Sequence, residues 1–387
     1  MPTSDCTRCA NLLVLVVSLS LSACSAPSEP PEPSSKSPQT CLDFEELVSP
    51  VPDLPITYQT EHLDIHVAES RFLCAGSAVD YELFVQHVAN ELGIEIQRRM
   101  PVYAMSHTTG YCSKPGGCAT RDGVVFALDQ NVYHELAHGV ACEIDSGSPA
   151  FLAEGLASTF DPYTNDSKVN STDLAELAEL RTNPLQPYYY EVSHFVRWLL
   201  EQLGPDAFRD IYRSATYDDG VWQAIEAAYG PAIAEDYAAE APLMWIQHRQ
   251  CADMPLLEPD AEGAWTYAAT LDCDEPTTLG PYEKSDSSDS NGSKDMYQSF
   301  LIDIPAPGKY RMERSDWLQV KYERCLDEHP MTEEEISERW VQHWVFFTFL
   351  EGYAIVEFEY AGLWRFDVLH DYGTPVDIWL TIVPEPG

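Results

Sequence analysis

The sequence is short of basic residues. In 387 residues it has 22 Lys and Arg against 63 Asp and Glu, a formal net charge of −41. Proteins that bind nucleic acid need a basic surface to displace counterions from the phosphates, so this composition argues strongly against that function. It equally disfavours docking on anionic lipid through a basic patch. We interpret the excess acid as a solvated surface that keeps the protein soluble.

Long hydrophobic runs are also lacking. The one extended apolar stretch, residues 11–23 (NLLVLVVSLSLSA), follows a short segment that carries the cation Arg8. A membrane-spanning helix takes about 20 residues, so a run this short predicts an export signal instead. The run ends in LSAC at residues 21–24, which resembles the bacterial lipobox.

The lipobox resemblance implies a lipoprotein. In that group the cysteine carries lipid and becomes the mature N-terminus, so we expect residues 1–23 to be a signal peptide and Cys24 to anchor the chain in a membrane. The expected location is the cell envelope of a bacterium, with the outer membrane favoured; an ordinary signal peptide, giving a secreted protein, is the alternative. Residues 24–40 are expected to form an extended tether, because the sixteen residues after Cys24 include five Pro and five Ser.

Cysteine pairs of the CxxC type are absent from the chain after residue 24, which argues against a thiolate metal site. Eleven cysteines are nevertheless many for a reducing compartment. Two leave with the signal peptide and Cys24 would carry lipid, so an even set remains and predicts disulfides of open connectivity. One pairing is local, because the Pro-Gly-Gly at residues 115–117 can turn the chain so that Cys112 meets Cys118. The remaining set is Cys41, Cys74, Cys112, Cys118, Cys142, Cys251, Cys273 and Cys325.

The body of the chain has two textures. Residues 41–250 mix strand and helix patterns, and residues 251–387 contain short strand patterns separated by turns. We therefore predict an α+β protein with a first domain at 41–250 and a β-sandwich-like domain at 251–387. In the first domain the expected strands are 54–67, 100–105 and 123–128, and the expected helices include 81–92, 192–203, 222–228 and 233–246. In the second the expected strands are 298–304, 309–313, 317–322, 341–349, 354–360, 363–369 and 376–383.

The chemistry is concentrated in the HELAH of residues 134–138. His134 and His138 are four residues apart, so on a helix they project from one face at a spacing that suits one Zn²⁺. Glu135 stands beside the first histidine, where its carboxylate can take a proton from metal-bound water. The pattern also occurs by chance, so a third ligand has to be found.

Two glutamates are candidates for that ligand. Glu143 lies about 140° around the helix from His138 and is expected to face away. Glu154 follows His138 after fifteen residues, within PAFLAEGLA, which predicts a second helix after one loop and an antiparallel return. Ala141 and Ile144 stand where the metzincin pattern needs Gly and His, so that class is excluded.

HELAH followed by FLAEGLA resembles the gluzincin clan of zinc metallopeptidases. The resemblance implies a small mixed sheet with two motif helices, with His134, His138 and Glu154 as zinc ligands. It also implies that Glu135 is the general base and that the substrate is a peptide or protein. Phe151 stands where Trp is common, and the gap between the motifs is shorter than in thermolysin-like and aminopeptidase members, which suggests a compact member. The likeness covers about residues 54–250.

Peptide hydrolysis also needs a donor for the tetrahedral oxyanion. Tyr189 is the family-like choice, with Tyr188, Tyr190 and His194 as rivals, and helix packing is an equal alternative for each aromatic residue. The strand at 123–128, just ahead of the metal helix, either binds peptide substrate by edge pairing or is an ordinary internal strand.

Other residues have simpler interpretations. His62 and His66, four apart on a strand, share a face but lie roughly 13 Å apart, too far for one metal. The tryptophans of the last third form either a sandwich core or a glycan-binding face. The second functional class is therefore a surface lipoprotein that binds protein or glycan, with an inactive peptidase-like domain. The tryptophans are Trp317, Trp340, Trp344, Trp364 and Trp379.

Overall fold

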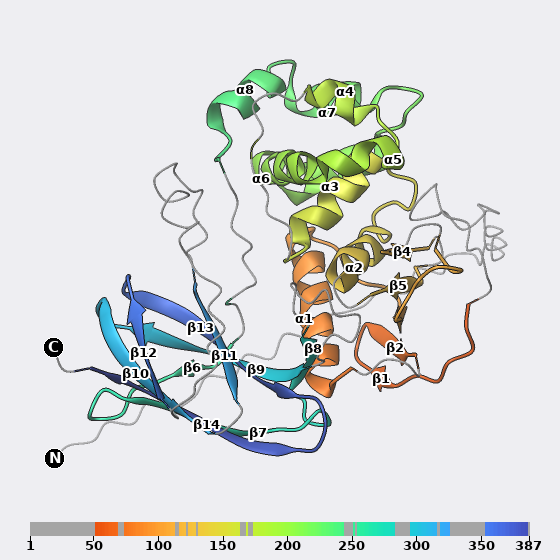
Figure 1. Ribbon diagram of the computed structural model, residues 1–387. Coiled ribbons are helices and arrows are strands. Elements are labelled where there is room, and N and C mark those ends of the chain that lie inside the picture. The colour runs from red at the N-terminus through yellow and green to blue at the C-terminus, as the bar shows by residue number, and fades with distance from the viewer. Residues whose placement is uncertain are drawn as a thin grey trace, which may run out of the picture. The chain divides into compact units, whose positions relative to one another are not determined.

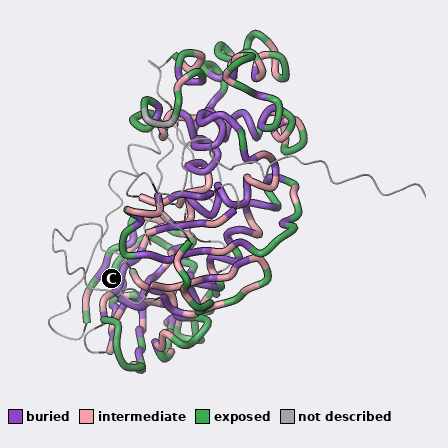
Figure 2. Tube along the Cα trace, turned by 90° about the vertical axis from the view of Figure 1, so that its right-hand side faces the viewer, coloured by how far each residue is buried: buried purple, intermediate pink, exposed green. Residues whose placement is uncertain are grey.

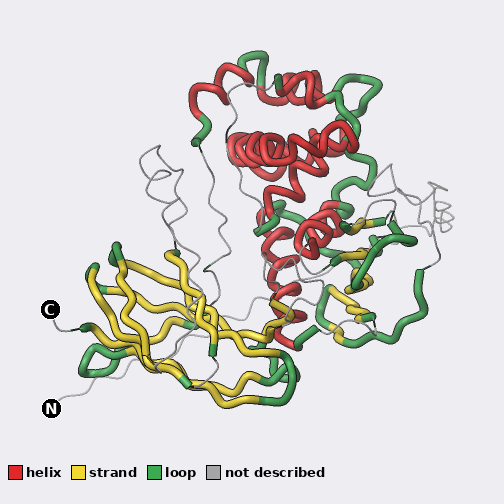
Figure 3. The backbone as a smooth tube through the Cα atoms, viewed as in Figure 1, coloured by secondary structure: helices red, strands yellow, loops and turns green. Residues whose placement is uncertain are grey.

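Strands alternate with helices in the first part of the chain and stand alone in the last part, as Figure 3 shows. In the computed structural model the described helices all lie between Ala75 and Glu240, and the described elements from Leu256 onward are strands. The protein thus combines helices with several sheets, which agrees with the predicted α+β class. The signal peptide, Cys24, the tether and the expected strand 341–349 lie outside the described residues. These are 51–68, 73–112, 116–120, 123–128, 131–162, 168, 173–243, 251, 254–282, 295–315, 318–325 and 353–385.

A mixed sheet in the order β1-β2-β3-β5-β4 underlies the first helices. The pairs β2–β3 and β3–β5 are parallel, whereas β1–β2 and β4–β5 are antiparallel. Strand β5 is therefore internal, so the edge-pairing interpretation of residues 123–128 is wrong, and the short strand β4 forms the edge instead. The strands are β1 (Tyr58–Gln59), β2 (Leu63–Val67), β3 (Met100–Ala104), β4 (Gly117–Ala119) and β5 (Val125–Ala127).

The expected single strand at 54–67 is a hairpin of β1 and β2. The turn between them is fastened to the first helix by Glu82, whose carboxylate accepts hydrogen bonds from the Thr60 hydroxyl and the His62 backbone N–H. The Thr60 N–H also donates to the carbonyl of Leu63 across the turn. The segment 54–67, which looks like one strand in the sequence, is thus divided by a turn that Glu82 of the first helix holds in place.

Two helices lie against this sheet and two others extend the core. Helix α2 contacts β4 and β5, helix α1 packs on α2, and α3 packs between α2 and α6 (Figure 1). Among the described residues, no helix combines the length and apolar character needed to cross a bilayer. The helices are α1 (Ala75–Glu91), α2 (Val132–Ala141), α3 (Ala150–Phe160), α4 (Leu174–Ala178), α5 (Thr182–Leu185), the 3-10 turn η2 (Gln186–Tyr188), α6 (Tyr189–Ser214), α7 (Val221–Tyr229) and α8 (Ile233–Glu240).

Glycine and proline set several helix ends. Helix α1 stops before Gly93 (φ 58°), as the sequence predicts. Helix α6 is broken at Gly204 (φ 74°) just before Pro205, which is the end expected for the 192–203 segment. Helix α8 is shorter than the predicted 233–246, because Ala241 precedes Pro242 and takes an extended conformation that ends the helix.

The later strands form two sheets around one hydrophobic core. Their orders are β12-β10-β14-β7 and β11-β13-β9-β6, with β8 also paired to β9. Phe358 of the first sheet contacts Tyr322 and Trp364 of the second, so the inner faces meet. The sequence missed β6 to β8. The strands are β6 (Leu256–Leu257), β7 (Trp265–Leu271), β8 (Leu279–Tyr282), β9 (Asp295–Ile304), β10 (Gly308–Arg314), β11 (Gln319–Arg324), β12 (Tyr353–Phe358), β13 (Gly362–Asp371) and β14 (Val376–Pro384).

The tryptophans of this region divide between core and surface. Trp364 is buried in the shared core, whereas Trp379 is 42% exposed on the outer face of its sheet. Trp317, Trp340 and Trp344 lie outside the described residues. The division of the chain near residue 250 stays a prediction.

All described cysteines are disulfide-bonded. The predicted Cys112–Cys118 bond is confirmed. Two further bonds join cysteines far apart in sequence, Cys74–Cys273 and Cys251–Cys325. The first links the residue before α1 to the segment between β7 and β8. There the Ser77 hydroxyl donates to the carbonyl of Gly280 and accepts from its N–H.

Candidate metal centre

Helix α2 carries the HELAH motif in a buried position. Val132, Leu136 and Val140 recur every four residues and are buried in the main hydrophobic cluster. This apolar stripe holds α2 against the sheet, and the other face of the helix carries His134 and His138 one turn apart. Both histidines therefore project from the same side of the helix, as their spacing predicts.

Glutamate 154 comes from α3, which is buried from Ala150 to Thr159 (Figure 2). The next residue, Gly155, allows α6 to pack directly on the backbone of α3. A Cβ atom at this position would lie 2.6 Å from Cγ2 of Val196 and 2.8 Å from Cγ1 of Val192. The close packing of α3 between α2 and α6 fixes the Glu154 carboxylate beside the two histidines.

The three side chains converge on one point. Nε2 of His134 lies 3.1 Å from Nε2 of His138 and 3.2 Å from Oε2 of Glu154. Nε2 of His138 lies 3.4 Å from the same carboxylate oxygen. Ligands about 2.0–2.1 Å from a tetrahedral zinc ion are about 3.3 Å from one another, so this triangle of donor atoms has the dimensions of one face of such a site. The residues fit zinc in donor chemistry and in spacing.

The charges of His134, His138 and Glu154 stabilise one another. Burial alone would lower the pKa of His134, but the hydrogen bond with Glu154 and the charge of Glu135 outweigh it and raise the pKa to about 9. Burial would raise the pKa of Glu154, and its hydrogen bonds with both histidines instead hold that pKa well below its ordinary value. The surroundings therefore favour a negative Glu154 carboxylate beside a protonated His134.

Glutamate 135 is buried on α2, next in sequence to His134 and close to strand β4. A Cβ atom on Gly117 of β4 would lie 2.8 Å from Oε1 of Glu135, which shows how closely the carboxylate approaches the edge strand. Its charge contributes to the raised pKa of His134. The predicted general base thus lies next to the ligand triangle and next to the sheet edge.

Of the proposed oxyanion donors, the structure brings Tyr189 to the site. Its ring lies 6.3 Å from the ring of His134, nearly parallel to it. Tyr188 and Tyr190 are exposed, at 37% and 54%. His194 is fully buried, and its Nδ1 lies 2.7 Å from the hydroxyl of Tyr237.

The remaining sequence candidates lie elsewhere. Glu143 forms an ion pair with Arg98 at 3.6 Å, in keeping with the expectation that it faces away. His66 has its Nδ1 2.8 Å from the carbonyl of Leu54. His62 has its Nδ1 2.6 Å from Oε1 of Glu82, so the two strand histidines have separate partners.

A second group of possible ligands consists of Glu61, His62 and Glu82, with donor atoms within 4.8 Å. The Glu82 carboxylate already accepts hydrogen bonds from Thr60, His62 and Gln86. Burial would raise its pKa, and these hydrogen bonds lower it. The contacts explain the group as a fastening of the β1–β2 turn to α1.

Two nearby residues escaped the sequence analysis. Asp161 ends α3, and its charge contributes to the raised pKa of His134. It is the residue directly after the helix, seven residues beyond Glu154, and its acidic character at that spacing was the available signal. Gly117 had no such signal, because its role depends on the packing of β4 against α2.

Comparisons with known proteins give little support for any family. No protein-family model matches the chain, and no curated protein matches it. Among solved structures, the chain is similar to PliG of Salmonella Typhimurium, a periplasmic inhibitor of g-type lysozyme, over 34% of this chain and 97% of that one. The TM-score is 0.19 at 9% sequence identity, a likeness too weak to carry an inference.

Proposed function

We propose that the protein is an exported zinc metallopeptidase of the gluzincin type. His134, His138 and Glu154 would hold Zn²⁺, and Glu135 would act as the general base. The observation that carries the proposal is the convergence of three donor atoms, 3.1–3.4 Å apart, from two helices with Glu135 beside them. Three protein ligands are typical of catalytic zinc sites, whereas structural sites have four.

The chemistry follows from these residues. Bound zinc would supply Lewis acidity and lower the pKa of a coordinated water. Glu135 accepts the proton of the attacking water at its carboxylate and returns it to the leaving amine. The hydroxyl of Tyr189 donates a hydrogen bond to the oxyanion that develops on the scissile carbonyl.

Strand β4 is the proposed site of peptide binding. It is the terminal strand of the described sheet and lies beside Glu135. An extended substrate that adds to this edge would bring its backbone next to the general base through main-chain hydrogen bonds. The strand at 123–128 is internal and cannot take that part.

Export and anchoring are supported by the sequence and by the cysteines. The lipobox-like segment would attach lipid to Cys24 and hold the protein in a bacterial cell envelope. The disulfides among the described cysteines suit an oxidising compartment.

Metal analysis and peptide digestion test the proposed function. The purified protein is expected to contain about one zinc per chain and to cleave a peptide library in a manner that chelation abolishes and zinc restores. Glu135→Gln should retain zinc and lose cleavage. Equal cleavage by wild type and Glu135→Gln would refute the mechanism. Binding of protein or glycan without cleavage would favour the lipoprotein binding module.

A further inference from the structure

Strand β4 passes very close to the side chain of Glu135. A Cβ atom on Gly117 would lie 2.7 Å from Cγ of Glu135 and 2.8 Å from its Oε1. It would also lie 2.8 Å from the backbone carbonyl oxygen of Phe126 in the neighbouring strand β5. Carbon atoms in contact are normally about 3.5–4.0 Å apart, so no side chain larger than hydrogen fits without movement.

The adjacent Gly116 faces the same helix under a weaker constraint. A Cβ atom there would lie 2.5 Å from Nδ2 of Asn131, and its next contact is 3.8 Å away. Asn131 directly precedes α2 and Glu135 lies in its first turn, so the start of α2 runs along both glycines. The Asn131 amide is the free end of a side chain and can rotate away, whereas Cγ of Glu135 and the carbonyl of Phe126 cannot.

Strand β4 cannot easily move away from α2. Cys118 is buried, pairs with Phe126 in the sheet and is disulfide-bonded to Cys112. The strand is therefore held on one side by β5 and at its middle residue, Cys118, by a covalent link. An added Cβ atom at Gly117 would therefore press on the Glu135 side chain as well as on the carbonyl of Phe126.

We infer that Gly117 is a positioning residue for Glu135, in that its missing side chain provides the space in which the carboxylate is held against the sheet edge. The inference rests on the proposed function for its catalytic meaning, but the contact itself can be tested by stability alone. It also explains the second glycine of residues 116–117 by close packing, where the sequence had indicated only a turn.

The first experiment is a double-mutant cycle on stability. Gly117→Ala, Glu135→Ala and the double variant are compared with wild type by thermal unfolding, with Gly116→Ala as the matched control. Removing Cγ and the carboxylate of Glu135 relieves two of the three close contacts. Gly117→Ala should therefore lower Tm in the wild-type background by roughly 3 °C or more beyond its effect in the Glu135→Ala background. Equal losses in the two backgrounds would overturn the inference.

The second experiment is kinetic. Gly117→Ala should lower kcat by on the order of 100-fold, the effect of a displacement of about 1 Å, with KM little changed and the zinc content at the wild-type level. Gly116→Ala should stay near wild type. A change in KM alone, or equal effects of the two alanines, would count against a positioning role. If wild type has no zinc-dependent activity, the proposed function fails, while the double-mutant cycle on stability still tests whether Gly117 and Glu135 are coupled.

Discussion

Three consecutive tyrosines precede or begin α6, and the ring of the middle one lies against His134. If Tyr189 donates to the oxyanion, Tyr189→Phe should lower kcat by roughly 100- to 1,000-fold, because the donor acts in the transition state. The value of KM should change little, and zinc should remain bound. Steady-state kinetics on a cleaved peptide measure this effect.

Its neighbours provide the controls. Tyr188→Phe and Tyr190→Phe remove the same atom from exposed side chains and should leave kcat within about threefold of wild type, since each removes no more than one weak hydrogen bond. Comparable losses in all three variants would point to packing or folding, and a larger loss at Tyr190 would transfer the donor role to that residue.

Individual site residues differ in how far the sequence reveals them. The proximity of His134, Glu135 and His138 follows from helical spacing alone, because the three residues lie within about one turn of each other. Glu154 needed a resemblance to a known clan, since the sequence does not fix where the second helix returns. Asp161 and Gly117 depend on packing between elements that no local pattern records.

Buried His194 should make stability sensitive to acid. Burial lowers its pKa to about 3, and the charges of Lys168 and Arg197 act in the same direction. The ordinary pKa of histidine is 6.5, so between about pH 3 and 6.5 the unfolded chain binds a proton at His194 that the folded chain does not bind. The stability from neutral His194 is thus complete above about pH 6.5 and is lost as pH falls toward 3.

We therefore expect His194→Gln to lose less stability between pH 7.5 and pH 5 than wild type, by on the order of 2 kcal/mol. Denaturant unfolding at the two pH values measures the difference, and His107→Gln, at an exposed position, is the control. Parallel losses in wild type and His194→Gln would mean that the folded protein accepts the proton.

At the scale of elements, the contact between α3 and α6 decides where Glu154 lies. Gly155→Ala should gain up to about 1 kcal/mol in helix propensity but lose roughly 1–3 kcal/mol from overpacking against Val192 and Val196. The expected outcome is a net loss of stability and weaker zinc binding, as α3 is displaced. Chemical denaturation and competition with a zinc chelator measure the two effects.

Adding Val196→Ala to Gly155→Ala tests the cause. Removing the methyl group nearest the new Cβ atom should recover part of the lost stability, so the two changes should be non-additive. Additive losses would show that the helices separate for another reason.

Elements with a regular sequence pattern could be predicted, but which elements pack or pair with one another could not. The apolar repeat of α2 and the glycines after α1 and within α6 set these helices correctly. The position of β5 inside the sheet depends on β4, which has three residues and begins with glycine. Short strands of this kind carry little pattern, and pairing across the sheet decides which strand is the edge.

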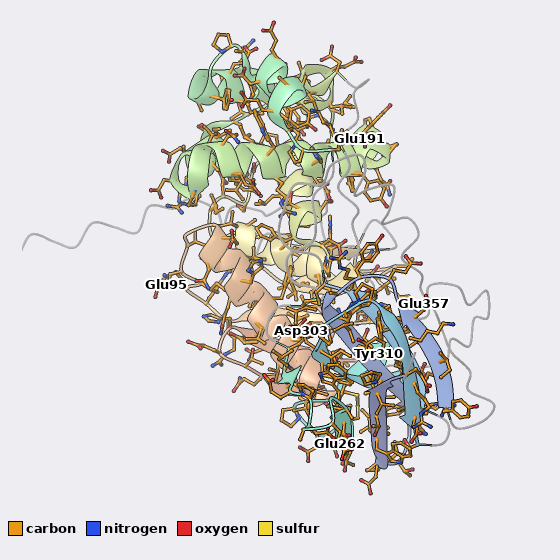
Figure 4. The ribbon with its side chains drawn as sticks, turned by 90° about the vertical axis from the view of Figure 1, so that its left-hand side faces the viewer. Glu95, Glu191, Glu262, Asp303, Tyr310 and Glu357 are labelled. Atoms are coloured by element: carbon orange, nitrogen blue, oxygen red, sulfur yellow. A yellow bond between two sulfur atoms is a disulfide. The ribbon has the colours of Figure 1, made fainter. Side chains whose placement is uncertain are left out.

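For the whole molecule, the acid excess is spread over many elements. Glu95, Glu262, Asp303 and Glu357 are exposed and come from separate parts of the chain, as Figure 4 shows. This distribution agrees with a solvated surface. Repulsion among so many negative charges destabilises the compact state, so the disulfides become important for the stability of the fold.

Two disulfides that close loops of very different length should have different effects on stability and on activity. Cys74 and Cys273 are 199 residues apart, and Cys112 and Cys118 are 6 apart. In the chain-entropy description the longer link is worth about 5 kcal/mol and the shorter about 2 kcal/mol. Cys74→Ser/Cys273→Ser should therefore be the more destabilising pair of changes, measured by the midpoint of denaturant unfolding.

If the proposed function holds, the Cys112–Cys118 bond should have the greater consequence for catalysis. Cys118 lies in β4 next to Gly117, so Cys112→Ser/Cys118→Ser frees the strand that contacts Glu135. Its kcat/KM should fall more than that of Cys74→Ser/Cys273→Ser, even though it unfolds at a higher denaturant concentration. The reverse order of activities would mean that the Cys74–Cys273 bond, through α1, controls the position of α2 more strongly than the sheet edge does. In that case the contact of the Tyr133 hydroxyl with Asp80 of α1 is the connection to examine, since Tyr133 precedes His134.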